Sequence, residues 1–152
     1  MKLYAFTSGD AMYGQEKIMA PEIYWLVLTV ILSTLQVVPY AIYRIGKIGL
    51  LQVFLNPLPG DAPFDKAWAH RAYRAHMNSF ENLTLFAPIA LAVVITNNGN
   101  ASTAIWTQVY FWARLLHWPM SITKAPFLRT MSYFLGLYAT MAMAWHLLSQ
   151  TL

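Results

Sequence analysis

Three long stretches of the chain contain no Lys, Arg, Asp or Glu: residues 23–43, 82–113 and 130–152. A helix of about 20 mostly apolar residues is long enough to cross the roughly 30 Å hydrocarbon core of a bilayer. The whole chain is 58% hydrophobic and 11% charged, whereas soluble domains are about 45–50% apolar and about 25% charged. The sequence therefore predicts an integral membrane protein and excludes a soluble domain or a disordered chain.

The middle charge-free stretch predicts two helices. The tetrad NNGN at residues 97–100 interrupts it and is typical of a tight turn. Each half is too short to cross a bilayer, so the second helix must extend back through Glu81 and Arg74, and the third must extend past Arg114. Charged residues are thereby drawn to the edge of the hydrocarbon, where they are costly and seldom face lipid.

The fold that these lengths predict is an all-α, integral membrane four-helix bundle. We expect helices at about residues 21–45, 66–97, 101–122 and 126–149, within a domain at 19–152. Pro39 should kink the first helix, and the turn signals at 56–63 predict a loop over residues 44–65. Residues 1–18 are a polar extension, and Met19 offers an alternative start of translation.

The basic residues predict the orientation of a multi-pass protein. They flank the first and third connections and are absent from the second; they are Arg44, Lys47, Lys66, Arg71, Arg74, Arg114, Lys124 and Arg129. Basic loops face the cytoplasm, so both termini should lie on the opposite side of the membrane, the inner membrane in a bacterium. The net charge of +4 reflects few acids rather than a basic tract, so no nucleic-acid partner is expected.

A polar stripe runs along the second predicted helix. Arg71, Arg74, Asn78 and Glu81 fall within an arc of about 80° at 100° per residue. Glu81 is the only acid after Asp65, so it is outnumbered by nearby arginines. The stripe is either a structural ladder of ion pairs or a pocket for an anionic ligand, in which Glu81 orients an arginine or receives an amine. The excess of positive charge favours the pocket.

The third and fourth predicted helices bring similar groups to the same depth. Arg114 and His117 are three residues apart and Arg129 and Tyr133 four apart, so each pair shares a helix face. His117 is either a hydrogen-bonded core residue or part of the pocket. There is no cysteine, and no histidine pairs with a carboxylate at helical spacing, so no metal site is expected. The chain also lacks a glycine-rich phosphate loop and a G-x-S-x-G nucleophile motif.

Three segments resemble the MAPEG family, the membrane-associated proteins in eicosanoid and glutathione metabolism. They are RAHMNSFEN at residues 74–82, YFWARLLH at 110–117 and PFLRT at 126–130. The last two are most similar to the family's bacterial branch. The resemblance implies a homotrimer of four-helix protomers that binds glutathione between neighbouring subunits, near the cytoplasmic surface.

The resemblance also implies roles for individual residues. Positions that match glutathione contacts are Arg74, Asn78, Glu81, His117, Thr130 and Tyr133. Arg129 matches the arginine that stabilises the glutathione thiolate, and Arg44 corresponds to the basic residue that ends the first helix. Arg71 and Arg114 add positive charge that suits the two carboxylates of the tripeptide.

Two positions depart from the catalytic members. Met77 stands where those members often have a further arginine, and Ser121 where they often have a tyrosine. The resemblance predicts a membrane-bound glutathione transferase or peroxidase acting on hydrophobic electrophiles or lipid hydroperoxides, with glutathione as co-substrate. The alternatives are a non-catalytic protein of the same fold that binds lipid, and a small proton-coupled exporter that uses Glu81.

Overall fold

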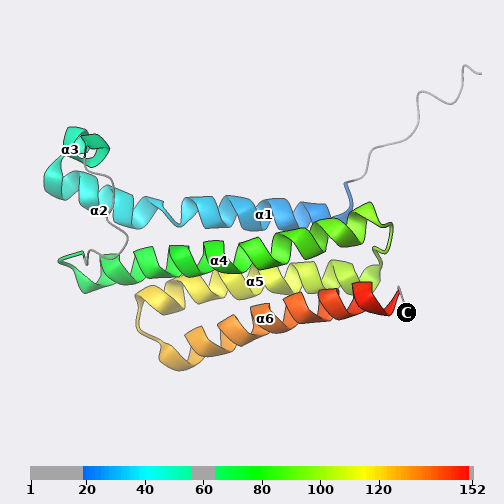
Figure 1. Cartoon of the computed structure of the whole chain (residues 1–152). Helices are drawn as coiled ribbons and strands as arrows, with labels where there is room; N and C mark the ends of the chain where they lie inside the picture. Colours follow the sequence, from blue (N-terminus) through cyan, green and yellow to red (C-terminus); the bar gives the residue numbers. More distant parts are fainter. Residues whose placement is uncertain (1–18, 56–63, 151–152) are drawn as a thin grey trace, which may run out of the picture.

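The computed structural model describes residues 19–55 and 64–150, and within these ranges the chain is helical with no strand (Figure 1). The predicted extension at 1–18 lies outside the described residues. The helices are α1 (Pro21–Leu35), α2 (Val38–Ile48), α3 (Leu50–Leu55), α4 (Ala67–Ile95), α5 (Ala101–Ile122) and α6 (Pro126–Ser149).

The first predicted helix is divided in two. α1 ends at Leu35, and α2 starts at Val38 with Pro39 in its first turn. Proline has no backbone N–H to donate to the carbonyl of residue 35, and its ring crowds that carbonyl, so the kink expected at Pro39 occurs just before it.

The prediction of a loop over residues 44–65 was wrong for its first part. α2 continues to Ile48 and α3 occupies Leu50–Leu55. This segment has no proline, and most of it is apolar, so nothing breaks the helix until Gly49, whose φ of 83° lies in the left-handed region. The turn signals that suggested the loop fall at 56–63, outside the described residues.

The turn between α4 and α5 has the chemistry of a helix start. Asn97 has a φ of 56°, which asparagine tolerates better than most residues. The Asn100 side chain accepts hydrogen bonds from the backbone N–H groups of Ser102 and Thr103, and the Thr103 side chain accepts one from the backbone of Asn100. This reciprocal capping satisfies donors that the first turn of a helix leaves unpaired.

Helices α1, α4, α5 and α6 lie side by side (Figure 1). α5 packs against the other three, and the apolar core between them includes Leu26, Phe86, Val93, Tyr110 and Met143. The start of α1, the α4–α5 turn and the end of α6 gather at one end, while the start of α4 and the α5–α6 turn lie at the other. The two ends thus carry different parts of the sequence.

Many polar side chains are buried in this structure, and many large apolar side chains lie on its outside. Thr29, Thr103 and Thr107 are fully buried, whereas Ile95 is 75% and Trp145 70% exposed. The stretches Pro21–Ile48 and Ala67–Ile95 are long and apolar enough to cross a membrane. Large apolar side chains left on the outside of a helical protein mark a surface that contacts lipid or a partner.

Candidate functional site

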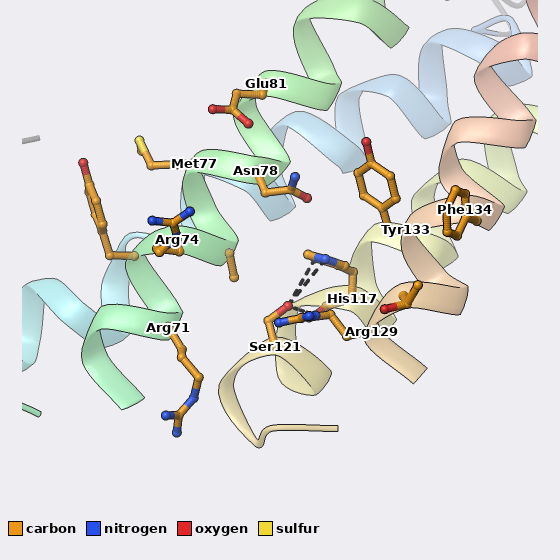
Figure 2. A pocket seen from close by; sticks show the side chains of 13 residues that line it. Arg71, Arg74, Met77, Asn78, Glu81, His117, Ser121, Arg129, Tyr133 and Phe134 are labelled. Carbon is orange, nitrogen blue, oxygen red and sulfur yellow. Dashed lines mark hydrogen bonds between the residues drawn. The ribbon is translucent and has the colours of Figure 1, made fainter. Parts of the chain in front are cut away.

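A cavity of about 690 Å³ opens where the first half of α4 faces the end of α5 and the start of α6 (Figure 2). Its lining comprises Arg71, Tyr73, Arg74, Ala75, Met77, Asn78, Glu81, His117, Ser121, Arg129, Thr130, Tyr133 and Phe134. All the site residues predicted from the sequence are among them except Arg44 and Arg114. The volume falls within the roughly 300–1,000 Å³ of small-molecule sites.

The α4 side of the cavity carries the polar stripe. Arg71 Nε donates a hydrogen bond to the carbonyl of Ile122 at 2.8 Å, which ties the start of α4 to the end of α5. The Asn78 side-chain oxygen is buried and accepts no hydrogen bond from the described residues. In Figure 2 this side chain points across the cavity, toward Tyr133. A buried amide oxygen without a partner is an acceptor available to a ligand.

The opposite side is built by α5 and α6. Ser121 Oγ donates to the carbonyl of His117 at 2.8 Å and lies 3.5 Å from both ring nitrogens of that histidine. The His117 and Tyr133 rings are 6.5 Å apart. Arg129 lies at the start of α6, close to His117 and Ser121 (Figure 2). These groups offer hydrogen-bond donors and positive charge opposite the α4 stripe.

Five lining residues were not predicted as site residues: Tyr73, Ala75, Met77, Ser121 and Phe134. The sequence singles out Met77 and Ser121 only as departures from the family pattern. Helical spacing carried a signal for them, because Ser121 is four residues after His117 and Met77 three after Arg74. Tyr73 and Phe134 adjoin predicted site residues in sequence, and nothing in the sequence distinguished them from the other aromatic residues.

The cavity has an excess of unpaired positive charge. Three arginines and one carboxylate line it, and among the described residues the only ion pair is Lys47–Asp65, away from the cavity. Glu81 therefore forms no ion pair with an arginine of the described chain, and the ladder considered from the sequence is not formed. Glu81 is also exposed rather than enclosed among the helices of the single chain, whereas the exporter alternative depends on a buried carboxylate.

Arg44 and Arg114 lie outside the lining of the cavity. Arg44 is half-buried on α2, which packs against α3 and α4. Arg114 is 1% exposed between α5 and α6, where Nη2 donates to the carbonyl of Tyr133 at 3.1 Å. Its guanidinium lies over the rings of Tyr110 and Tyr133, 5.2 and 5.6 Å from their centroids. Arg114 therefore supports the α6 wall from behind.

The space for Arg114 is provided by Gly136. A Cβ atom at that position would overlap the guanidinium. Nε and Nη1 of Arg114 have no hydrogen-bond partner among the described residues, although both are buried. A buried cation without an acid is costly, and the hydrogen bond to the Tyr133 carbonyl and the contacts with two tyrosine rings offset part of that cost.

The sequence of this chain matches a known protein family. The model described as "MAPEG family" matches residues 23–149 and so includes every residue that lines the cavity. No curated protein and no solved structure matches the chain significantly.

Proposed function

The chain belongs to the MAPEG family, and from this premise we propose that it is a membrane-bound glutathione transferase or peroxidase. The observation that carries the proposal is the cavity, in which three arginines and one carboxylate remain unpaired with one another. Glutathione has two carboxylates and one ammonium group, so its charges complement that set.

The α4 stripe binds the peptide part of glutathione in this proposal. Arg71 and Arg74 face the carboxylates, for which a guanidinium offers two parallel N–H donors. Glu81 receives the ammonium group, and the unpaired oxygen of Asn78 accepts a peptide N–H. Binding would thus satisfy polar groups that the described chain leaves without partners.

Arg129 stabilises the thiolate. The pKa of an ordinary thiol is about 8.5, so glutathione is mostly protonated at neutral pH. A guanidinium beside the sulfur lowers the pKa of the bound thiol, and each unit requires about 1.4 kcal/mol of extra stabilisation of the thiolate. His117, Thr130 and Tyr133 surround the same region and complete its hydrogen-bonding groups.

The thiolate then reacts with an apolar substrate. With an aryl halide, the sulfur forms a bond to carbon and the halide leaves with its electron pair. With a hydroperoxide, the sulfur takes one oxygen and the alcohol leaves; a second glutathione then yields the disulfide and water. Met77 and Phe134 provide the apolar part of the cavity against which such a substrate can lie.

We include membrane topology and assembly in the proposal. Four long helices span the bilayer as a bundle, with the basic loops cytoplasmic, and three copies form a trimer. Arg74, Glu81 and Arg129 are exposed in the single chain, and a neighbouring subunit would cover them and enclose the ligand. A hydrophobic substrate would reach the thiolate from the lipid.

Calorimetry of glutathione binding to the detergent-purified protein, with ultraviolet difference absorbance to detect thiolate, tests this proposal. We expect wild-type protein to bind glutathione as the thiolate and to conjugate an aryl halide. Arg129→Ala should lose the thiolate signal and about 100- to 1,000-fold of the turnover, the usual effect of removing one group that stabilises a reacting anion. Arg129→Lys keeps the charge but not the planar donor fork. Its thiolate signal and turnover should lie between those of wild type and Arg129→Ala.

The role of Arg129 would be refuted by full thiolate formation and turnover in Arg129→Ala. Absence of glutathione binding to the wild-type protein at millimolar concentrations would refute the transferase proposal as a whole. The second candidate, a non-catalytic lipid-binding protein, is favoured by the apolar side chains of Met77 and Phe134 in the lining. Saturable lipid binding without turnover of any electrophile or hydroperoxide would support it.

A further inference from the structure

A second candidate site, acidic where the first is basic, lies at the other end of the molecule, at the start of α1. Glu22 is 3% exposed, and its Oε1 accepts a hydrogen bond from the Thr103 hydroxyl at 2.5 Å. No basic side chain of the described chain forms an ion pair with this carboxylate, and its hydrogen bond with Thr103 uses Oε1 alone. A buried carboxylate without a counter-charge is costly, so a cation within reach would stabilise its charged form.

Glu22 faces a cavity of about 460 Å³ between the start of α1 and the α4–α5 turn. The cavity is lined by Ala20, Pro21, Glu22, Val94, Asn97, Gly99, Asn100, Ala101 and Ala104, and so by no basic side chain. Gly99 makes room for the carboxylate, because a Cβ there would lie 3.2 Å from Oε1. The small residues around Glu22 thus leave one of its oxygens open to a ligand.

Capping of α5 does not account for Glu22. The N–H groups of Ser102 and Thr103 are already bound by the Asn100 side chain, at 2.8 and 3.0 Å. The Thr103 hydroxyl also accepts the Asn100 N–H at 2.8 Å. This cap is complete without a carboxylate, so Glu22 is not needed to satisfy these N–H groups of α5.

We propose that Glu22 and its cavity bind a primary ammonium group. An ammonium group has three N–H donors and needs few oxygen acceptors, which the open oxygen of Glu22 and the side chain of Asn97 provide. A calcium or magnesium ion needs six or more oxygen ligands, and the rest of the lining is mostly apolar. Those apolar side chains suit the methylene groups that carry an amine.

Two sources could supply the ammonium group, and they are distinguishable. One is the headgroup of an aminolipid, because the apolar stretch Pro21–Ile48 begins at this cavity and its first turn would lie at a membrane surface. The other is a soluble amine. A phosphatidylcholine headgroup carries a quaternary ammonium without N–H donors, so it serves as the matched negative control.

Native mass spectrometry of the full chain with phosphatidylethanolamine and phosphatidylcholine of identical acyl chains tests the site, and calorimetry with ethanolamine tests the soluble source. We expect wild-type protein to prefer phosphatidylethanolamine about tenfold, the equivalent of one charge-assisted hydrogen bond. Glu22→Gln, which keeps the shape but not the charge, should abolish the preference. Ethanolamine bound in a Glu22-dependent way, without lipid preference, would assign the soluble source.

The proposal is overturned if wild-type protein does not discriminate between the two lipids and binds no ethanolamine, or if Glu22→Gln binds as wild type does. Should Glu22→Gln fail to fold, Ala104→Leu fills the cavity while keeping the carboxylate, and we expect it to abolish binding too. Neither variant touches the arginine-lined cavity, so both should bind glutathione as wild type does. Failure of the transferase proposal would therefore leave this test intact.

Discussion

The two ends of the packed helices differ in how many of their polar side chains find partners. At the Glu22 end, polar side chains find partners on other segments: Thr103 donates to Glu22, and His146 Nε2 lies 3.0 Å from the backbone carbonyl of Asn98. At the arginine-lined end, Glu81 and the facing arginines form no ion pair within the described chain. Apart from the open oxygen of Glu22, the polar groups at the first end are hydrogen-bonded and join helices, whereas unpaired groups at the second end are available to a ligand. Substitutions in the hydrogen bonds of Asn100 should therefore reduce stability at the first end, and substitutions in the arginine-lined cavity should reduce ligand binding at the second.

The substitution with the largest expected effect on stability is at Gly136, between the two ends of the molecule. Gly136→Ala places a methyl group against the Arg114 guanidinium. We expect a loss of about 2–3 kcal/mol in the free energy of unfolding, because overpacking a rigid site typically costs about 1–3 kcal/mol. Thermal or denaturant unfolding in detergent measures it.

A double variant tests whether overlap with Arg114 causes this loss of stability. If overlap with Arg114 is the reason, Arg114→Leu should relieve the penalty of Gly136→Ala, and a double-mutant cycle should show coupling of about 1 kcal/mol or more. Strictly additive effects would show that the penalty has another source.

The next effect tests the arginine-lined end. Glu81→Gln removes the only carboxylate of the cavity and, under the proposed function, the partner of the glutathione ammonium group. We expect about a tenfold loss of glutathione affinity, from one charge-assisted hydrogen bond, and an unchanged melting temperature because Glu81 is exposed and unpaired. A large drop in melting temperature would show that Glu81 stabilises the fold. It would contradict the expectation that polar residues at the arginine-lined end serve ligand binding rather than stability.

The Glu22 end should respond in the opposite way. Asn100→Ala removes the side chain that caps α5, and such a loss costs about 1 kcal/mol of stability. Glutathione affinity, measured by calorimetry, should stay the same. Ser102→Ala is the matched control, because it leaves the Asn100 cap in place.

The smallest effect concerns the contact between α1 and α4. Ser33 and Ser79 share a buried hydrogen bond of 2.9 Å. Ser33→Ala should cost about 1 kcal/mol, because it leaves the partner hydroxyl unsatisfied. The double variant Ser33→Ala with Ser79→Ala should cost less than the sum of the two single variants, and unfolding experiments on all three test this.

The sequence predicted most of the arginine-lined cavity because its residues repeat at helical spacing. Arg71, Arg74, Asn78 and Glu81 share one face of α4 whatever the helix packs against. Arg114 is the instructive exception, since it shares a face with His117 yet lies outside the cavity lining. Gly136 on the neighbouring helix creates a space that draws its guanidinium between α5 and α6, and such a contact between helices has no signal along one helix.

The sequence alone determined the features that depend on residues close to one another along the chain. The charge-free stretches, the kink near Pro39 and the turn at residues 97–100 follow from the composition of each segment, from the missing N–H of proline and from the turn preference of Asn and Gly. The tertiary structure decided which polar groups find partners: it enclosed Glu22 beside Thr103 and left Glu81 without an arginine. Pairing depends on distances between helices, which only their packing sets.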